Sequence, residues 1–420
     1  MYFCKKKFIV FQIVSISTFF DHTDNMPLSA FKNLSLKKVL LKSLTINGKN
    51  TIPNLSKEIG YSIPTVTKFI DELLEEGMIH DFGNNRKANG RRASIYGINP
   101  DAFYFLGVVV KRASVRFCLQ SADGVNAKIE EKVDYLLENS QESLDQLCDI
   151  INGFIDHSQA PRKKIVGVCI SLSGFINTRE GFIHSFFCFD EKPLASVIES
   201  KIGVKTYLEN DSRAMTIGEY ISGVVQGEQE VLFVDISWGI GIGIVCRGQI
   251  YYGKSGISGE FGHTPLFDNE IICQCGKKGC FETEVSGQAL ERKVKEKLQA
   301  GGTSALTQKY DIDSITFDHI IQVINEQADV LAIEVVEEIG EKLGRYLTLL
   351  VSIFNPELVI IGGTLSAVYD YMRHPVQTAL KRHTVGPLIQ DVKIKTSQLG
   401  ADAGVVGACY LVRGKFFDLM

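Results

Sequence analysis

Residues 259–282 read GEFGHTPLFDNEIICQCGKKGCFE and contain one histidine, His263, followed by Cys273, Cys275 and Cys280. Three thiolates and one imidazole complete the tetrahedral coordination of Zn²⁺ and leave no position open for water or substrate. The two glycines of the C-x-C-G-x-x-G-C run favour a tight turn, which a buried strand or helix does not require. The pattern therefore predicts a structural zinc site that holds a loop. The alternative is three buried cysteines and a core histidine.

This segment resembles the zinc signature of the ROK family, which groups bacterial sugar kinases with sugar-responsive transcriptional repressors. The preceding residues 231–262, VLFVDISWGIGIGIVCRGQIYYGKSGISGEFG, and residues 359–366, VIIGGTLS, are also similar to sequences of this family. The likeness covers most of residues 101–420. It implies an α/β fold, a two-lobed actin-like (ribonuclease H-like) body with a cleft between its lobes.

Size and composition limit the class of protein. A chain of 420 residues is too long for one hydrophobic core and predicts two or three domains. A formal net charge of −4 argues against a protein that is basic throughout, so nucleic-acid binding requires a local basic patch. The ten cysteines are scattered apart from the C-x-C…C cluster, which favours a reducing cytoplasm over a disulfide framework.

The N-terminal residues differ in character from the rest of the chain. Lysines at positions 5–7 precede the apolar run FIVFQIVSISTFF at residues 8–20, and together they resemble a secretory signal. The run is too short to span a bilayer comfortably, and no convincing cleavage site follows it. We interpret residues 1–34 as a disordered extension or a misassigned start, with Met26 as the functional beginning of a cytoplasmic protein. A true signal or membrane anchor is the alternative.

Residues 35–100 have the pattern of a winged helix-turn-helix domain. Ser35 is predicted to cap a first helix, and Thr51 is predicted to start a short second one. Ser62 is placed to cap the third helix, which Gly77 closes in the left-handed conformation. Two strands with a loop between them follow. The sequence therefore predicts a helical, winged DNA-binding domain in front of the α/β body.

Positive charge is concentrated in this domain. Over residues 35–68 six lysines face a single acid, Glu58, and the loop at residues 83–92 holds four cations and no acid. A helix N-terminus that enters the major groove, with wing cations that reach phosphate or the minor groove, fits this distribution. A small helical domain with a solvated charged hairpin is the alternative. The predicted DNA-binding residues are Ser62, Thr65, Thr67, Lys68, Arg86, Lys87, Arg91 and Arg92.

Strands and helices alternate beyond Pro100, which is typical of an α/β body. With the family resemblance, this pattern assigns residues 101–212 to a small lobe. Residues 213–400 form a large lobe that carries the zinc loop. A C-terminal helix within residues 401–420 is expected to pack back on the small lobe.

A polar pair, Asn210 and Asp211, ends one of the predicted strands. A carboxylate can accept a hydroxyl proton or hydrogen-bond two hydroxyls. In ROK kinases the residue that matches Asp211 is the general base toward the sugar. The resemblance extends the predicted sugar site to Asn210, Asp211, Glu260, His263 and Glu282. For each carboxylate alone, a helix cap or surface acid is the alternative, and the absence of the family's Pro-Asn pair from residues 184–189 leaves the sugar open.

ROK kinases open their body with an Asp-x-Gly-Gly-Thr turn, whose glycine amides hold ATP phosphates. The corresponding residues here are Val109, Val110, Lys111, Arg112 and Ala113. No glycine cradle remains, and no acid is left to position Mg²⁺. The indole of Trp238 would also crowd a triphosphate in the second phosphate element. Because phosphoryl transfer depends on positioning, we expect a kinase homologue without catalytic activity.

The sequence thus predicts a sugar-responsive transcriptional regulator, most simply a repressor of carbohydrate-utilisation genes. Its expected cofactor is structural Zn²⁺. Its expected partners are operator DNA, a sugar or sugar phosphate, and further copies of the chain in a homodimer or homotetramer, with no membrane. Two alternatives stay open. One is a hexose or N-acetylhexosamine kinase that uses Asp211 as general base, and the other is a repressor whose signal is a protein partner.

Overall fold

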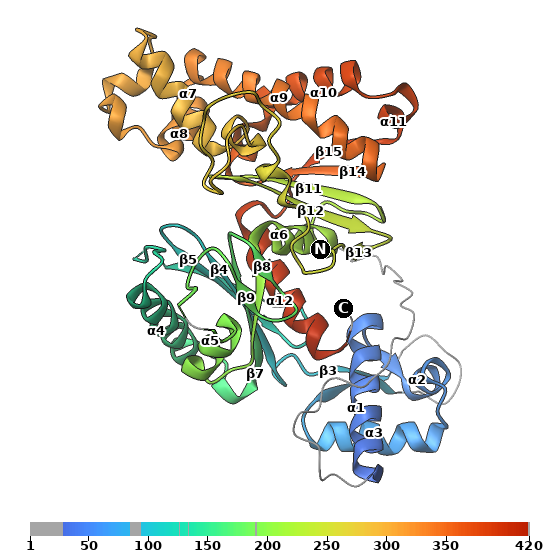
Figure 1. Cartoon of the computed structure of the whole chain (residues 1–420). Helices are drawn as coiled ribbons and strands as arrows, with labels where there is room; N and C mark the ends of the chain where they lie inside the picture. The colour runs from blue at the N-terminus through green and yellow to red at the C-terminus, as the bar shows by residue number, and fades with distance from the viewer. Residues whose placement is uncertain (1–27, 85–93, 126, 133, 190, 419–420) are drawn as a thin grey trace.

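The computed structural model describes residues 28–84, 94–125, 127–132, 134–189 and 191–418. These residues form an N-terminal head and two α/β lobes, with two long helices between the lobes (Figure 1). In this part of the chain, no helix combines the length and the apolar character that crossing a bilayer requires.

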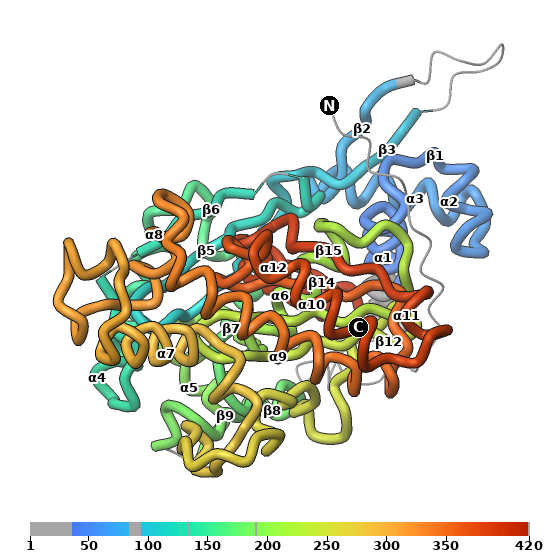
Figure 2. The backbone as a smooth tube through the Cα atoms, turned by 90° about the horizontal axis from the view of Figure 1, so that it is seen from above, coloured from blue at the N-terminus to red at the C-terminus, as the bar shows by residue number. Residues whose placement is uncertain are grey.

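The head consists of three helices and a small antiparallel sheet. Its elements are α1 (Leu28–Asn47), β1 (Asn50–Thr51), α2 (Ile52–Ile59), α3 (Ile63–Glu75), β2 (Ile79–Asn84) and β3 (Ser94–Ile98). The strands pair in the order β1-β3-β2. Leu40, Leu55 and Ile70, one from each helix, are fully buried in a shared core. Ile79 of β2 and Ile98 of β3 also belong to this core, and the opposite ends of the two strands project away from it (Figure 2).

The helix ends of the head follow from local sequence, with one correction. Thr51 and Ser62 cap α2 and α3 as predicted, and Gly77 adopts a left-handed φ of 68° after α3. The prediction that Ser35 caps the first helix was wrong, because α1 already begins at Leu28. No glycine or proline interrupts residues 28–47, so a serine within this run does not end the helix.

The first lobe is a five-stranded sheet with helices packed against it. Its elements are β4 (Tyr104–Val110), β5 (Val115–Ser121), β6 (Ala127–Lys132), α4 (Gln141–His157), β7 (Ile165–Leu172), β8 (Ile176–Asn177), β9 (Phe182–Ile183), α5 (Leu194–Ile202) and β10 (Thr206–Asn210). The strand order is β10-β7-β4-β5-β6. On one side of β4 the pairing is antiparallel and on the other side it is parallel.

The second lobe repeats this arrangement. Its elements are β11 (Val231–Ile236), β12 (Ile240–Cys246), β13 (Gln249–Ile250), α7 (Gly287–Gln299), α8 (Phe317–Gln327), α9 (Val330–Phe354), β14 (Leu358–Gly362), α10 (Tyr369–His383), α11 (Gly386–Asp391) and β15 (Lys393–Thr396). In the order β13-β12-β11-β14-β15, the pairs on one side of β11 are again antiparallel and those on the other side are parallel. The repetition confirms the predicted two-lobed, ribonuclease H-like α/β body.

Two helices, α6 (Asp211–Ser222) and α12 (Ala403–Phe416), lie together between the lobes (Figure 1). Their backbones touch. A methyl group at Gly407 would lie 1.8 Å from the carbonyl oxygen of Ala214, and one at Gly218 would lie 2.1 Å from that of Ala403. Only glycine permits this approach, so the relative position of the two helices is fixed by backbone contact.

The C-terminal end of α12 reaches the head (Figure 1). Asp418 forms an ion pair of 2.7 Å with Lys38 of α1, and its backbone carbonyl accepts a hydrogen bond of 2.9 Å from Lys42. The guanidinium of Arg413 donates to the backbone carbonyl of Thr45 at 3.2 Å. Head and body are therefore joined through polar contacts between α1 and the end of α12.

Replacing Gly407 tests the backbone contact. We expect Gly407→Ala to destabilise the protein by about 1–3 kcal/mol, because the added methyl group overpacks the contact between α6 and α12. Gly153→Ala is the matched control, since Gly153 lies inside α4 and a methyl group there meets nothing within 4 Å. That change should stabilise the protein by roughly 0.5–1 kcal/mol. Thermal unfolding of both variants measures this, and equal midpoints would contradict the close contact.

Candidate functional site

The segment between β13 and α7 brings four metal-ligating side chains together. His263 lies at the end of a short 3-10 turn, Glu260–His263, and Cys280 directly precedes a second one, Phe281–Thr283. Isolated β-bridges fold the intervening loop back on itself. Gly276 and Gly279 adopt left-handed φ values of 83° and 67°, as the tight turn predicted from the sequence requires.

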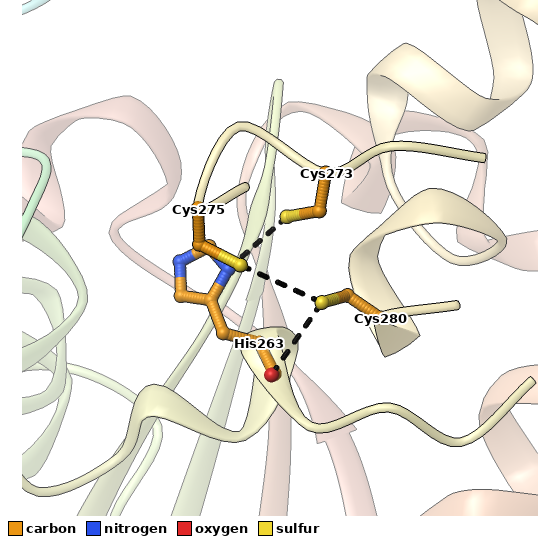
Figure 3. A group of neighbouring side chains, drawn as sticks. All are labelled: His263, Cys273, Cys275 and Cys280. Atoms are coloured by element: carbon orange, nitrogen blue, oxygen red, sulfur yellow. Dashed lines mark hydrogen bonds between the residues drawn. The ribbon is translucent and has the colours of Figure 1, made fainter. Parts of the chain in front are cut away.

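The donor atoms of these side chains fit a tetrahedral metal. The Nδ1 atom of His263 and the sulfur atoms of Cys273, Cys275 and Cys280 all lie within 4.8 Å of one another. The sulfurs of Cys275 and Cys280 are 3.6 Å apart, and Nδ1 lies 3.3 Å from the sulfur of Cys273. A zinc–sulfur bond of about 2.3 Å places neighbouring ligands of a tetrahedron about 3.8 Å apart. Figure 3 shows one ring nitrogen of His263 directed at the sulfurs. The four residues can therefore hold one metal ion.

The same loop holds two carboxylates beside the metal ligands. The Nε2 atom of His263 faces away from the sulfurs and lies 3.9 Å from a carboxylate oxygen of Glu260. Glu282 accepts a hydrogen bond of 3.4 Å from the Cys273 thiol and one of 3.3 Å from the backbone amide of Ile240. The metal loop thus fixes the positions of both glutamates.

The other two predicted ligand-binding residues lie where β10 meets α6. The side chain of Asn210 caps α6 by accepting from the backbone amide of Arg213, and it donates to the carbonyl of Gly174 at 3.3 Å. Asp211 accepts hydrogen bonds from the amide of Ser212 at 2.8 Å and from the hydroxyl of Ser173. Both side chains are therefore positioned by backbone groups at the end of a strand.

These acids lie close enough to influence one another. Burial raises the pKa of Glu260 to about 7, and the guanidinium of Arg213 opposes this shift. The carboxylates of Asp211 and Glu282 add to the shift in the pKa of Glu260. Several acceptors grouped around one amide and one imidazole suit a neutral ligand that carries several hydroxyl groups.

Beneath this region lies a buried ion pair that the sequence analysis did not identify. Arg213 and Glu209 are almost completely buried and lie 2.7 Å apart. Glu209 also accepts from the hydroxyl groups of Tyr252 at 3.0 Å and Thr178 at 3.1 Å. The guanidinium of Arg213 donates to the carbonyl of Ser258, next to the metal loop. The i, i+4 spacing of the pair was the available signal.

The residues that correspond to the kinase phosphate turn make contacts with α12 and with a turn of the second lobe. Val109 is buried and packs against α12, where its side chain lies close to Gly404. The guanidinium of Arg112, in the turn between β4 and β5, lies 5.1 Å from the ring centroid of Trp238, in the turn between β11 and β12. The turn between β4 and β5 therefore contacts the turn between β11 and β12.

Another buried acid, Asp235, lies beside the cleft at the end of β11. It is 5% exposed and accepts hydrogen bonds from the hydroxyl groups of Ser237 at 2.7 Å and Ser212 at 3.2 Å. Burial raises the pKa of Asp235 to about 7, and the nearby carboxylate of Asp211 adds to this shift. The sequence analysis did not single out Asp235, because its burial depends on packing between the lobes.

The structure places some of the predicted DNA-binding residues at the start of α3. Ser62 accepts from the amide of Thr65 at 3.4 Å, the hydroxyls of these two residues are 2.7 Å apart, and the hydroxyl of Thr67 donates to the carbonyl of Ile63. Lys68 is exposed. The remaining predicted residues, Arg86, Lys87, Arg91 and Arg92, lie outside the described residues.

Comparison with known sequences identifies the body. Residues 106–415 match the sequence profile of the ROK family. The chain belongs to the ROK family. The match begins in β4 and ends in α12, so it spans both lobes and confirms the family that the metal loop and the glycine-rich turns indicated.

Several curated relatives extend the similarity into the head. The xylose repressor of Bacillus subtilis (strain 168) is 26% identical over 91% of this chain and 96% of its own length. The DNA-binding transcriptional repressor Mlc of Escherichia coli (strain K12) is 24% identical over 87% of this chain and 89% of its own. The dual regulator NagC of the same strain is 26% identical, with coverage of 83% and 85%.

Among solved structures, one matches the head and the body together, and another matches the body alone. A ROK family transcriptional regulator, described as a homologue of the Escherichia coli Mlc protein, superposes with a TM-score of 0.75, covering 92% of this chain and 97% of its own, at 25% identity. A ROK glucokinase from Streptomyces griseus, in complex with glucose and AMPPNP, superposes with a TM-score of 0.64 at 24% identity. The glucokinase covers only 74% of this chain, although 99% of its own length is matched, and it shows the shared fold of the body.

The metal content of the purified protein tests whether the cluster of His263, Cys273, Cys275 and Cys280 binds a metal ion. We expect about one tightly bound divalent metal ion per purified chain, measured by inductively coupled plasma mass spectrometry. Cys275→Ser should remove most of this metal and lower the thermal midpoint, because one of four ligands is lost. Cys188→Ser is the control, since Cys188 is exposed and lies outside the cluster. Equal metal content in both variants would contradict the assignment.

Proposed function

We propose that this chain is a DNA-binding transcriptional repressor whose affinity for its operator is controlled by a sugar. The observation that carries the proposal is the attachment of a head with three helices and a small antiparallel sheet to a ROK body, by direct contacts between α1 and the end of α12. The relatives named as repressors align over both parts of the chain. A kinase requires no such head, which favours the regulator.

On this proposal the head, residues 35–100, binds a palindromic operator in the cytoplasm as part of a homodimer or homotetramer. The N-terminus of α3 enters the major groove, and the segment between β2 and β3 contacts the backbone or the minor groove. Half-sites would then be about one helical turn, or a multiple of it, apart. The fold of the head supports this role, because its helices α2 and α3 meet through a three-residue turn at residues 60–62.

The ligand is proposed to be a sugar or a sugar phosphate, bound between the small lobe (residues 101–212) and the large lobe (residues 213–400). Its hydroxyl groups would be bound by Asn210, Asp211, Glu260, His263 and Glu282. Zn²⁺ is the metal that best suits three thiolates and one imidazole, and its role would be to fix His263 and the two glutamates. The hydrogen bond from the backbone amide of Ile240 to Glu282 and the distance of 3.9 Å between Glu260 and the Nε2 atom of His263 support this role.

We further propose that the chain has no kinase activity. An acidic residue that positions Mg²⁺ is replaced by Val109, which is buried against α12. The contact between Arg112 and Trp238 occupies the region that the phosphates of ATP take in this family. Phosphoryl transfer depends on metal ions and glycine amides at these positions, so their replacement removes the means of positioning ATP.

A continuous structural connection supports the coupling between sugar and DNA. Asp211 is the first residue of α6, and α6 contacts α12 through backbone at Gly407 and Gly218. The end of α12 then holds α1 through Asp418 and Arg413. A ligand that moves α6 when the lobes close would therefore displace the head. A coupling free energy of about 1–3 kcal/mol is typical of such systems.

A titration of operator binding tests the function. DNA from the gene's own upstream region should bind the protein, and one sugar or sugar phosphate of a panel should release it. Asp211→Ala should keep the operator affinity and weaken sugar binding roughly ten- to hundredfold, because a hydrogen-bonding charge is lost. Asp370→Ala, at an exposed acid of α10, should behave like the parent. Operator binding that no sugar alters would favour a protein signal, and sugar-dependent formation of ADP would favour the kinase alternative.

Arg413 tests the connection between α12 and the head. Arg413→Met keeps most of the side-chain stem and removes the hydrogen bond to Thr45. We expect unchanged sugar binding, but a sugar-induced loss of operator affinity that is about two- to tenfold smaller than in the parent. Arg373→Met, at an exposed arginine of α10, is the control. Fluorescence anisotropy with a labelled operator measures both, and a parent-like response of the Arg413 variant would exclude this route.

A further inference from the structure

Two large apolar side chains are exposed at the start of α3. Tyr61 is 48% exposed and Ile63 is 51% exposed, and Pro64 beside them is also exposed. The opposite face of α3 is buried in the core of the head through Val66, Phe69 and Ile70. Tyr61, Ile63 and Pro64, which we call the apolar tip, are therefore not part of the packing that stabilises the head. Their exposure indicates a surface that contacts another molecule.

The hydroxyl groups in the same turn are already engaged within the helix. Ser62 caps the amide of Thr65, and the two hydroxyls are 2.7 Å apart. The hydroxyl of Thr67 donates to the backbone carbonyl of Ile63 at 2.9 Å. A base contact that needs the hydroxyl proton of Thr67 would have to replace the hydrogen bond to the carbonyl of Ile63. A contact between DNA and the apolar parts of Tyr61 or Ile63 does not require the loss of a hydrogen bond within the helix.

Charge indicates which end of α3 meets DNA. The first turn of the helix contains no acid, and its N-terminus carries the positive end of the helix dipole. Lys68, one turn further on, has a side chain that is 63% exposed. The acids of the segment, Asp71, Glu72, Glu75 and Glu76, all lie in its C-terminal half. The DNA phosphates repel the acids of this C-terminal half. The N-terminal turn with Tyr61 and Ile63 is therefore the part of α3 that faces the bases.

We propose that Ile63, together with Tyr61, reads thymine in the operator by packing against the thymine 5-methyl groups in the major groove. This inference rests on the proposed repressor function and names the chemical feature of DNA that the head recognises. Among the four bases only thymine presents a methyl group in the major groove, and apolar side chains are suited to contact it. Burial of one methyl group changes affinity by about fourfold.

Deoxyuridine provides the test, because it pairs as thymine does and lacks only the 5-methyl group. The site protected in the gene's own upstream DNA is prepared as two duplexes, one with thymine and one with deoxyuridine throughout the protected segment. Affinities of the parent and of Ile63→Ala are measured on both duplexes. Ile221→Ala serves as the matched control, since Ile221 is a similarly exposed isoleucine on α6 in the body.

The parent should bind the thymine duplex at least fourfold more tightly than the deoxyuridine duplex. Ile63→Ala should lose affinity for the thymine duplex and lose little for the deoxyuridine duplex, while Ile221→Ala should match the parent on both. Equal losses of Ile63→Ala on both duplexes, or a parent indifferent to the methyl groups, would overturn the inference and leave the repressor function standing; the apolar tip would then serve a protein contact. A parent that binds neither duplex would overturn both proposals.

Discussion

The backbone contact between α6 and α12 is the constraint on which the rest of this structure depends. Gly407 and Gly218 allow the two helices to approach until carbonyl oxygens of one lie against the other. The helix α6 begins with Asp211, in the proposed sugar site. Near its other end, the buried Glu219 accepts hydrogen bonds from Ser397 and Leu399, which lie just before α12. Because the interior of a protein is close-packed, a helix held in this way moves with its neighbour rather than past it.

A second constraint is the crowding of negative charge in the cleft. Burial and the nearby carboxylates of Asp211 and Glu282 raise the pKa of Glu260 to about 7, and this disfavours the charged form of Glu260. Local hydrogen bonds and the adjacent metal loop hold these acids in place before any ligand arrives. On the proposed function, a ligand rich in hydroxyl groups would supply hydrogen-bond donors to these acids.

The sequence was sufficient for features that depend on local chemistry. The clustering of His263 with three cysteines, the caps Thr51 and Ser62, and the left-handed Gly77 each follow from a residue type at a fixed spacing. Features that depend on contacts between distant segments could not be predicted from local sequence patterns. The start of α1 at Leu28 was missed because Ser35 is an acceptable cap in isolation. The contact of Arg112 with Trp238 joins two turns that only the folded lobes bring together, and no local pattern encodes it.

That contact also bears on the proposal that this fold works as a switch without ATP. A nucleotide bound between the lobes would hold them together through several phosphate contacts, whereas a cation–π contact of one arginine with one tryptophan contributes about 0.5–2 kcal/mol. This is of the same order as the coupling free energy of typical allosteric proteins. One small ligand can therefore oppose or reinforce it. On the proposed function, replacing a strong nucleotide clamp with a weak protein contact would leave the relative position of the lobes under the control of a ligand bound at Asp211.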